Sequence, residues 1–297
     1  MINRRQMVAG AGALAGLAAV PVCARLRGGA ESLEHQLRRI EAAHGGRLGV
    51  AVLDSGGRSK AGHRGEERFP LLSTFKLLLA GAVLARVDGG NLRLDERLHY
   101  SCAELVAHSP VTEKHAGGEG MTVDALCDAT MTLSDNTAAN LLLRLLGGPA
   151  GLTAYLRLLG DDITRLDRWE TELNEAVPGD PRDTTTPHAM LKTMAKLTLG
   201  DALSPASRQR LQGWLLRNRT GDARLRALLP AGWSAGEKTG TGAYRTSNDV
   251  GLLWPPSGSP ILVAAYLTEG SPEAAVRDWA LAQVGAAVAA AWERRRP

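Results

Sequence analysis

The stretch Leu71-Leu72-Ser73-Thr74-Phe75-Lys76-Leu77-Leu78-Leu79 places a hydroxyl and an amine three residues apart in an otherwise apolar run. If this run is helical, Ser73 and Lys76 lie on one face and can interact. A serine needs a neighbouring base to become a nucleophile, and burial among leucines lowers the pKa of a lysine. The stretch therefore predicts an activated serine, with a capping serine and a solvated lysine as the alternative.

The composition of the whole chain is that of a globular protein. It has 297 residues, of which 44% are hydrophobic and 22% are charged, and its formal net charge is +4. Because no long basic run with interleaved aromatic residues occurs, we expect no nucleic-acid partner. The histidines lack the spacing of zinc ligands and no phosphate-binding glycine-rich motif occurs, so we expect no metal and no cofactor.

Residues 1–24 have the organisation of a secretory signal peptide. Arg4 and Arg5 precede an apolar stretch at residues 7–22, and Val22-Cys23-Ala24 offers small residues to a signal peptidase. Residues 3–7 also resemble a twin-arginine export signal. We therefore expect an exported protein, periplasmic or secreted, with no stable membrane anchor; an anchor that stays uncleaved is the alternative.

Two cysteines, Cys102 and Cys127, lie beyond the predicted signal peptide. An exported protein can oxidise such a pair, but two cysteines do not define a disulfide framework. Free cysteine is among the most buried residue types, so we expect both to be small buried side chains.

Apolar spacing predicts the order of the secondary-structure elements. Strands are expected at residues 48–53, 237–241, 249–254 and 261–267, and helices at residues 31–43, 71–87, 123–132, 138–146, 151–159, 188–199, 204–217 and 273–294. Strands thus come at both chain ends with helices between them. This order predicts an α+β fold, with an antiparallel sheet built from both ends, flanked by helices, and an inserted all-helical lobe.

The predicted lobes form one catalytic domain at residues 25–297. We place an α/β lobe at about residues 25–65 plus 217–297 and a helical lobe at about residues 66–216. A cleft at the junction of two lobes is a usual place for a site. Residues 165–183 lack any helical or strand periodicity, and their prolines, acids and arginines predict a compact Ω-loop pinned by ion pairs.

Two further motifs carry groups suited to chemistry. Ser134-Asp135-Asn136 lies in a polar gap between two predicted helices and can aim a hydroxyl and an amide into a cleft, although a helix cap is the simpler interpretation. Lys238-Thr239-Gly240 lies on a predicted strand and continues into Thr241-Gly242. A lysine and threonines there can hold a carboxylate, and glycine lets a ligand approach the strand.

In this order the three motifs are those of penicillin-binding proteins and class A β-lactamases. From about residue 30 to its end the chain resembles a class A serine β-lactamase, with further support from residues 109–115, 134–140 and 168–174. The resemblance implies hydrolysis of β-lactam antibiotics through a serine acyl-enzyme, small-molecule β-lactams as partners, and a monomer. Glu170 and Asn174 match the Glu-x-x-Leu-Asn pattern that supplies the base for deacylation in class A.

The resemblance also implies the catalytic roles. Ser73 attacks the lactam carbonyl, and Lys76 or Glu170 takes its proton, the latter through a water. Ser134 relays a proton to the departing lactam nitrogen, and Glu170 with Asn174 activates the water that hydrolyses the ester. The backbone N–H groups of Ser73 and Thr241 form the oxyanion hole.

By the same resemblance, Lys238, Thr239 and Thr241 bind the substrate carboxylate, and Asn136 holds the acyl-amide side chain. The complete set of expected substrate-binding residues is Asn136, Lys238, Thr239, Gly240, Thr241, Arg224 and His108. In this family an arginine often assists carboxylate binding from one of several positions. Ser247 occupies one of these positions, and Arg224 matches another, so Arg224 is expected to assist the carboxylate. His108 replaces the aromatic residue at the mouth of the cleft. Arg168 and Asp183 match the structural ion pair that closes the Ω-loop.

Some family features are absent from this chain. Ala80 stands where some members have the disulfide partner of Cys127, and Leu72 and Gly242 stand where some carbapenem-hydrolysing members have linked cysteines. Two alternatives share the nucleophile: a D,D-peptidase or transpeptidase, and a non-catalytic β-lactam sensor domain. Neither should carry the base and amide of Glu170 and Asn174.

Overall fold

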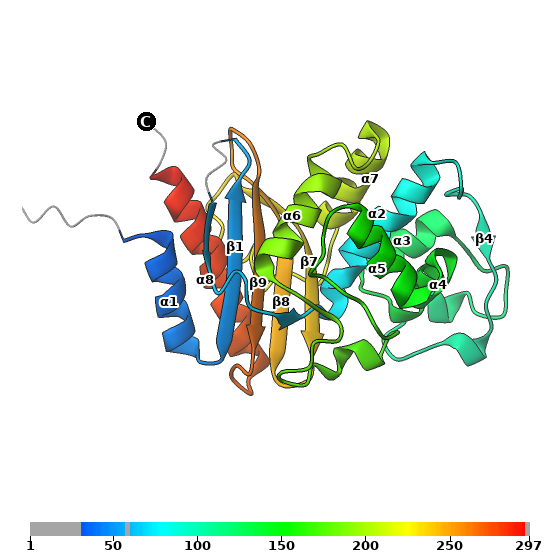
Figure 1. Ribbon diagram of the computed structural model, residues 1–297, viewed down its shortest axis with the longest axis horizontal. Helices are drawn as coiled ribbons and strands as arrows, with labels where there is room; N and C mark the ends of the chain where they lie inside the picture. Colours follow the sequence, from blue (N-terminus) through cyan, green and yellow to red (C-terminus); the bar gives the residue numbers. More distant parts are fainter. Residues whose placement is uncertain (1–30, 57–59, 295–297) are drawn as a thin grey trace, which may run out of the picture. The chain divides into compact units, whose positions relative to one another are not determined.

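A computed structural model describes residues 31–56 and 60–294 of the chain (Figure 1). All elements named below belong to one compact unit that begins at Ser32. The strands are β1 (Arg47–Asp54), β2 (Lys60–His63), β3 (Phe69–Pro70), β4 (Arg97–Leu98), β5 (Met121–Thr122), β6 (Thr184–Thr185), β7 (Ser234–Gly242), β8 (Thr246–Trp254) and β9 (Ile261–Thr268).

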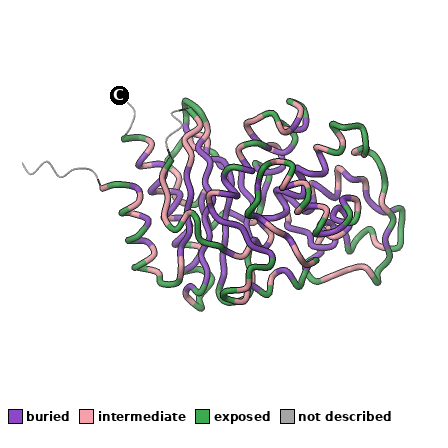
Figure 2. The backbone as a smooth tube through the Cα atoms, in the orientation of Figure 1, coloured by how far each residue is buried: buried purple, intermediate pink, exposed green. Residues whose placement is uncertain are grey.

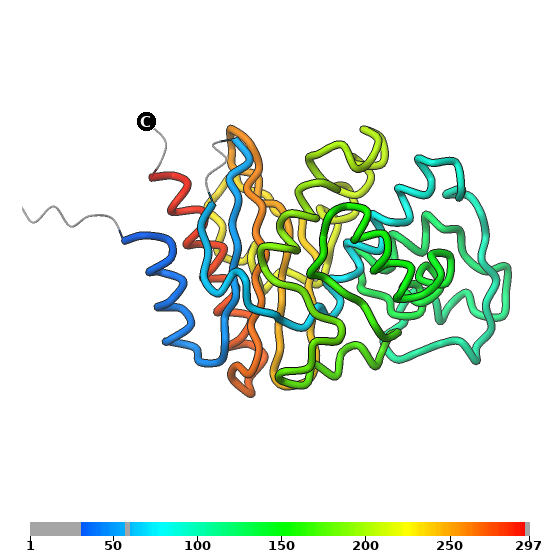
Figure 3. Tube along the Cα trace, viewed as in Figure 1, coloured from blue at the N-terminus to red at the C-terminus, as the bar shows by residue number. Residues whose placement is uncertain are grey.

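The main sheet joins the two ends of the described chain. Its strand order is β2-β1-β9-β8-β7, and every neighbouring pair is antiparallel. In Figure 3 the blue N-terminal strand therefore runs beside the orange C-terminal strands. All eight residues of β9 are buried, because this central strand is covered on both faces. The predicted α+β fold with a sheet from both chain ends is confirmed.

Helices α1 (Leu33–His44) and α8 (Ala274–Glu293) pack together on one face of the sheet (Figure 1). A separate hydrophobic cluster fills this layer and includes Leu37, Val263 and Leu281. Alanine and glycine are frequent along α8, which allows the long helix to lie close to the strands. The terminal helices thus seal the sheet face opposite the helical lobe.

The other helices follow one another between β3 and β7 in the sequence. They are α2 (Phe75–Asp88), α3 (Val123–Thr132), α4 (Asn136–Leu146), α5 (Gly148–Leu158), α6 (Pro187–Thr198) and α7 (Pro205–Leu216), with short 3₁₀ helices η1 (Leu72–Thr74), η2 (Cys102–Glu104), η3 (Thr112–Lys114) and η4 (Glu172–Glu175). Apart from Lys76, the residues of α2 from Phe75 to Leu84 are apolar, and this stretch of the helix is buried (Figure 2). Helix α2 is the central helix of the helical lobe.

Helix starts follow the polar residues that precede them. The side chains of Ser32, Thr122, Asp135, Thr186 and Ser204 each accept a backbone N–H in the first turn of α1, α3, α4, α6 and α7. The helices and strands expected from apolar spacing are present, with ends shifted by a few residues. One expected helix is divided, because residues 72–74 form η1 and α2 begins only at Phe75.

Both described cysteines are free thiols. Cys127 is buried on α3 as expected, but Cys102 is exposed at the start of η2, so the expectation of burial is wrong for that residue. Cys102 lies in a 3₁₀ turn without any buried residue, where no apolar layer covers it. The predicted signal peptide at residues 1–24 lies outside the described residues. Within residues 31–56 and 60–294, no helix has both the length and the apolar character needed to span a membrane.

Candidate active site

The candidate nucleophile stands where η1 meets α2. Lys76 lies in the first turn of α2, and its Nζ donates to Ser73 Oγ over 3.0 Å. Lys76 is fully buried, whereas Ser73 is partly exposed. The amine is therefore held behind a hydroxyl that a substrate can reach.

Close packing of β7 fixes the backbone around Ser73. Leu72 has a φ of 47°, a left-handed conformation that a leucine adopts only where its surroundings enforce it. A Cβ atom placed on Gly240 would lie 2.9 Å from Leu72 Cβ and 3.3 Å from Ser73 N. Glycine at position 240 is thus required for β7 to approach the nucleophile, which explains the glycine of the Lys-Thr-Gly motif.

Ser134 lies in the tight connection between α3 and α4, with a φ of 60°. Asp135 holds this connection, because its carboxylate accepts the N–H of Ala138 at the start of α4. The same carboxylate accepts the N–H groups of Val111 and Thr112, at 3.0 and 2.9 Å. Asp135 is therefore both a helix cap and the link that fixes the Ser134 loop to a neighbouring loop.

Lys76 Nζ is the centre of the polar network. In addition to Ser73 Oγ, it lies 2.8 Å from Ser134 O, 3.2 Å from Ser134 Oγ, 2.5 Å from Asn136 Oδ1 and 2.9 Å from Glu170 Oε1. An ammonium group has three protons to donate, fewer than the five oxygen atoms around it. Lys76 can therefore redistribute hydrogen bonds among these groups and move a proton between them.

Lys238 approaches the same hydroxyl from β7. Its Nζ donates to Ser134 Oγ over 3.1 Å and to Thr239 O over 2.9 Å, and the side chain is fully buried. Ser134 Oγ thus lies between two lysine amines. A hydroxyl in this position can accept a proton from one side while it gives its own to another group.

Burial shifts the titration of both amines. Loss of solvation lowers the pKa of Lys76, although the nearby carboxylate of Glu170 raises it. Burial, together with the charge of Lys76, holds the pKa of Lys238 well below that of a solvated lysine. Each amine therefore releases its proton more readily than a surface lysine does.

Glu170 approaches the nucleophile from the Ω-loop. Its Oε1 lies 3.4 Å from Ser73 Oγ, although the two residues are 97 positions apart in the sequence. Asn174 Nδ2, one turn later in η4, donates to Glu170 Oε2 over 2.5 Å. Asn174 Oδ1 is buried and has no partner among the described protein atoms, so it remains able to accept a hydrogen bond.

Ion pairs join the two ends of the Ω-loop, and the sequence predicts such pairs from the acids and arginines of residues 165–183. Arg168 Nε lies 2.6 Å from Asp183 Oδ2, and Asp183 Oδ1 accepts the backbone N–H groups of Asp167 and Arg168. Arg165 pairs with Asp167, and the buried Leu173 anchors η4 in the main hydrophobic cluster. The loop that carries Glu170 is therefore a packed structural element.

Asn140 is a site residue to which the sequence analysis gave no role. Its Oδ1 accepts the backbone N–H of Glu170 over 3.0 Å, and its Nδ2 donates to the carbonyl of Glu170 over 2.9 Å. This amide on α4 clamps the peptide groups on both sides of the Glu170 Cα. In the sequence, its role is indicated only by its position one helical turn after Asn136, within residues 134–140.

Arg224 lies behind β7. The guanidinium is buried, with Nη2 2.7 Å from Thr241 Oγ1, Nη1 2.9 Å from Gly240 O and Nε 2.8 Å from Asp278 Oδ1. Thr241 itself is exposed. Arg224 is therefore positioned to support Thr241 and to add positive charge beneath it.

The remaining expected residues lie on two sides of the site. Thr239 is buried on β7, with its Oγ1 2.5 Å from Thr220 Oγ1. His108 is exposed, and its ring Nε2 lies 3.1 Å from Leu133 O. The backbone carbonyl of His108 accepts the N–H of Asn136, so this residue also helps to hold the start of α4.

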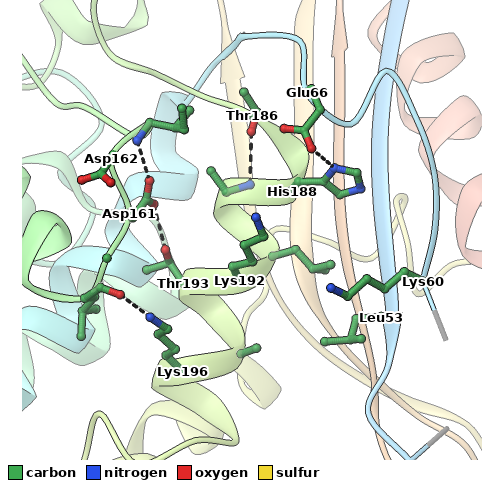
Figure 4. Close-up of a pocket in the computed structure, with 16 residues that line it drawn as sticks. Leu53, Lys60, Glu66, Asp161, Asp162, Thr186, His188, Lys192, Thr193 and Lys196 are labelled. Carbon is green, nitrogen blue, oxygen red and sulfur yellow. Dashed lines mark hydrogen bonds and ion pairs between the residues drawn. The ribbon is translucent and has the colours of Figure 1, made fainter. Parts of the chain in front are cut away.

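A separate cavity of about 450 Å³ contains none of these groups (Figure 4). It is lined by α6, by Lys60 of β2 and by the segment that leads into the Ω-loop. His188 pairs with Glu66 there, and Lys196 donates to Leu159 O. Its polar groups are thus paired with each other or exposed, as Lys60 is. The described residues contain no cluster of three or more His, Cys, Asp or Glu side chains that could hold a metal ion.

Known proteins share this fold. Residues 32–292 match the sequence profile of the beta-lactamase enzyme family. The class A β-lactamase of the last common ancestor of Gram-negative bacteria has 61% sequence identity and a TM-score of 0.86, covering 88% of this chain and 100% of its own. A proposed class A β-lactamase, PenP from Rhodopseudomonas palustris, has 56% identity and a TM-score of 0.86, with 88% and 100% coverage.

A mutant of the same ancestor, solved with the transition-state analogue 5(6)-nitrobenzotriazole, has 60% identity and a TM-score of 0.87, covering 89% of this chain and 100% of its own. With a profile match over nearly the whole chain, the protein belongs to the beta-lactamase enzyme family. It is a class A β-lactamase, a hydrolase of small-molecule β-lactams. The peptidase and sensor alternatives are not favoured.

Proposed function

We propose that Ser73 is the nucleophile of this β-lactamase and that Glu170 is the base for deacylation. The observation that carries the proposal is the convergence of Ser73 Oγ, Lys76 Nζ and Glu170 Oε1 within 3.4 Å of one another. Such a group contains a nucleophile, a base that can activate it, and a second base on another element. These are the parts that a two-step acyl transfer to water requires.

In the first step, Ser73 Oγ attacks the lactam carbonyl and transfers its proton to Lys76 or, through a water, to Glu170. Both routes are short, because Lys76 Nζ lies 3.0 Å and Glu170 Oε1 3.4 Å from the hydroxyl. The lowered pKa of Lys76 makes its neutral, basic form more accessible than that of a solvated lysine. The backbone N–H groups of Ser73 and Thr241 stabilise the oxyanion, and one such donor typically contributes about 2.7–4 kcal/mol.

Ser134 delivers a proton to the departing lactam nitrogen. The Ser134 hydroxyl then takes a new proton from Lys76, which has itself received the Ser73 proton. Lys238 stabilises the negative charge that develops on Ser134 Oγ. Lys238, Thr239 and Thr241 bind the substrate carboxylate on β7. Arg224 supports this group from behind through Thr241 Oγ1.

Asn136 and His108 contact the substrate side chain on the opposite side of the site. Asn136 Nδ2 donates to Ala107 O and its Oδ1 faces Lys76, which fixes the orientation of the amide. Gly240 leaves room for the ligand beside β7. The structural pair Arg168 and Asp183 keeps the Ω-loop closed around the base.

Deacylation uses a water held by Glu170 and Asn174. The carboxylate takes a proton from the water, while Asn174 Oδ1, which has no other partner in the described protein, accepts a second hydrogen bond. The hydroxide attacks the ester carbonyl, and Ser73 leaves with a proton returned through Lys76 or Glu170. The hydrogen bond from Asn174 Nδ2 to Glu170 Oε2 fixes the separation of the amide and the carboxylate.

Turnover of a chromogenic cephalosporin tests this assignment. The purified chain should hydrolyse the compound continuously, and Ser73→Ala should lose covalent labelling by penicillin in intact-protein mass spectrometry. Persistent labelling of Ser73→Ala would contradict the nucleophile. A single stoichiometric burst by the unmodified chain would indicate a sensor or transpeptidase instead.

We also propose that residues 1–24 direct export and are then removed, leaving a periplasmic or secreted monomer without a stable membrane anchor. The basic start, the apolar stretch and the small residues before position 25 support this proposal. N-terminal sequencing of the protein from a bacterial periplasmic extract tests the cleavage. Sedimentation of the mature protein tests the monomer.

A further inference from the structure

The cavity beside α6 has an apolar floor. Its volume of about 450 Å³ lies within the range of sites that hold small organic molecules. Four of its lining side chains belong to the main hydrophobic cluster or pack against it, namely Leu53, Leu159, Leu191 and Ala195. The cavity therefore offers a ligand an apolar surface that is continuous with the core of the protein.

Two lysines without partners lie at the same cavity. Lys60 comes from β2, which is the edge strand of the main sheet, and Lys192 comes from α6; both are exposed. Figure 4 shows the Lys60 side chain extending from β2 toward α6. Neither amine has a hydrogen-bond or ion-pair partner in the part of the chain that the structure describes. Their positive charges are therefore available to a ligand.

The buried acid in the cavity wall is fully engaged. Asp161 Oδ1 accepts the backbone N–H groups of Ile163 and Thr164 over 3.0 and 2.8 Å, and its Oδ2 accepts from Thr193 Oγ1 over 2.8 Å. These bonds fix the segment that leads into the Ω-loop against α6. The carboxylate of Asp161 is thus part of the wall and does not neutralise Lys192, which precedes Thr193 on the helix.

The other charged groups of the cavity leave the two lysines unneutralised. Glu66 Oε1 lies 2.8 Å from His188 Nδ1, and Lys196 donates to Leu159 O. Asp162 is exposed, and in Figure 4 its side chain lies beyond Asp161, on the side away from Lys60 and Lys192. The β2 side of the cavity therefore carries an excess of positive charge.

An apolar floor next to two unpaired ammonium groups fits a ligand with an apolar body and a negative charge. We propose that this cavity binds a small amphipathic carboxylate, with its chain on the floor formed by Leu53 and Leu191 and its carboxylate between Lys60 and Lys192. A neutral apolar molecule would not pair with the lysines. A small hydrophilic anion would leave the apolar floor in contact with water.

This site is separate from the proposed catalytic site. None of the groups proposed to act on the β-lactam lines the cavity, so its ligand and the substrate do not share a binding residue. The ligand would instead contact residues 159–163, which lead into the Ω-loop, and one face of α6. Its binding can therefore be measured without any reference to catalysis.

Titration of the isotope-labelled protein with octanoate tests the site by NMR. Backbone amide signals of α6 and of residues 159–163 should shift and saturate, with a Kd on the order of 1 mM for a ligand of this size. The absence of saturable shifts in both segments at about 20 mM octanoate would overturn the proposal.

Two further ligands separate the contributions of chain and charge. We expect 1-octanol, which has the chain without the charge, to bind at least about fivefold more weakly than octanoate. Acetate, which has the charge without the chain, should give no saturable shift because it buries almost no apolar surface. If either compound bound as tightly as octanoate, the assignment to an amphipathic carboxylate would be wrong.

Substitution of the lysines tests where the carboxylate lies. Lys60→Gln and Lys192→Gln should each raise the Kd of octanoate about fivefold, the effect of losing one partly exposed ion pair. Lys114→Gln is the matched control, because it removes the same charge from an exposed position outside this cavity and should leave the Kd unchanged. An equal loss of affinity in all three variants would indicate attraction by net charge and would overturn the site.

Filling the cavity tests where the chain lies. Ala195→Leu adds apolar atoms at a partly exposed position of α6 and keeps a residue that favours helices, so it should raise the Kd at least about tenfold. Unchanged binding by folded Ala195→Leu would contradict the site. If this variant failed to fold, the lysine variants at exposed positions would still decide. Failure of the chain to hydrolyse β-lactams would refute the proposed function and leave this test intact.

Discussion

Replacing Glu170 by glutamine should separate the two halves of the reaction. Glutamine has the shape of glutamate, and its amide oxygen can keep the hydrogen bond from Asn174 Nδ2, so the Ω-loop should keep its structure. The substitution removes only the carboxylate that is 2.9 Å from Lys76 Nζ and 3.4 Å from Ser73 Oγ. Its effects are therefore chemical.

The expected loss is larger for deacylation than for acylation. A positioned general base contributes about 10²–10⁴-fold, or about 2.7–5.5 kcal/mol, and hydrolysis of the ester loses all of it. Acylation retains Lys76, and because Glu170 raises the pKa of this lysine, its removal shifts Lys76 further toward the neutral form that can accept the Ser73 proton. The acyl-enzyme should therefore accumulate.

Stopped-flow absorbance with a chromogenic cephalosporin and intact-protein mass spectrometry measure this outcome. Glu170→Gln should give a burst of one product per enzyme, and the mass of the acylated protein should persist. Glu172→Gln, an exposed acid on the same loop, is the matched control and should turn over normally. Steady turnover by Glu170→Gln within about tenfold of the unmodified protein, without an acylated species, would refute the reasoning.

Three further changes have defined outcomes. Asn140→Ala removes both hydrogen bonds to the Glu170 backbone, so stability in urea should fall by about 1–3 kcal/mol and deacylation should slow more than acylation; equal slowing of both steps would contradict the clamp. The lowered pKa of Lys238 means that its charge is lost as the pH rises through a value below 10.5, so kcat/KM for a carboxylate-bearing β-lactam should fall there, and Lys238→Arg should move the fall to higher pH. An unmoved basic limb in that variant would assign it to another group. Thr186→Ala removes the cap of α6 that accepts the N–H of Ala189 and should cost about 0.5–2 kcal/mol in thermal or urea unfolding, whereas Thr186→Ser should retain most of that stability.

Local sequence patterns were sufficient to predict features that lie within a single helix or strand. The i, i+3 spacing of Ser73 and Lys76 places both groups in the turn where η1 meets α2, and apolar periodicity located the helices and four strands of the main sheet, all but β2. The division of the helix expected at residues 71–87 was not predicted; it occurs beside Leu72, which has a φ of 47° and packs closely against β7. The lobe boundaries near residues 65 and 217 stay a prediction.

The roles of individual polar residues depended on contacts with distant segments of the chain, which local sequence patterns do not predict. Arg224 was expected to assist the substrate carboxylate, and only the packed structure shows that its guanidinium is enclosed behind Thr241. In the sequence Asn140 has no feature that distinguishes it from other helical residues, whereas in the structure it binds the backbone of Glu170 in the Ω-loop. Cys102 was expected to be buried but lies at the surface. No periodicity reports such contacts, because each joins segments that are distant in the sequence.

The sequence by itself determined the chemical groups, their order along the chain and the class of fold, since these follow from residue types and short-range spacing. Only the tertiary structure decided which groups meet: Glu170 of the Ω-loop at the nucleophile and the two lysines at Ser134. The physical reason is that burial and close approach set both the geometry and the protonation of these groups. Burial is a property of the packed chain as a whole.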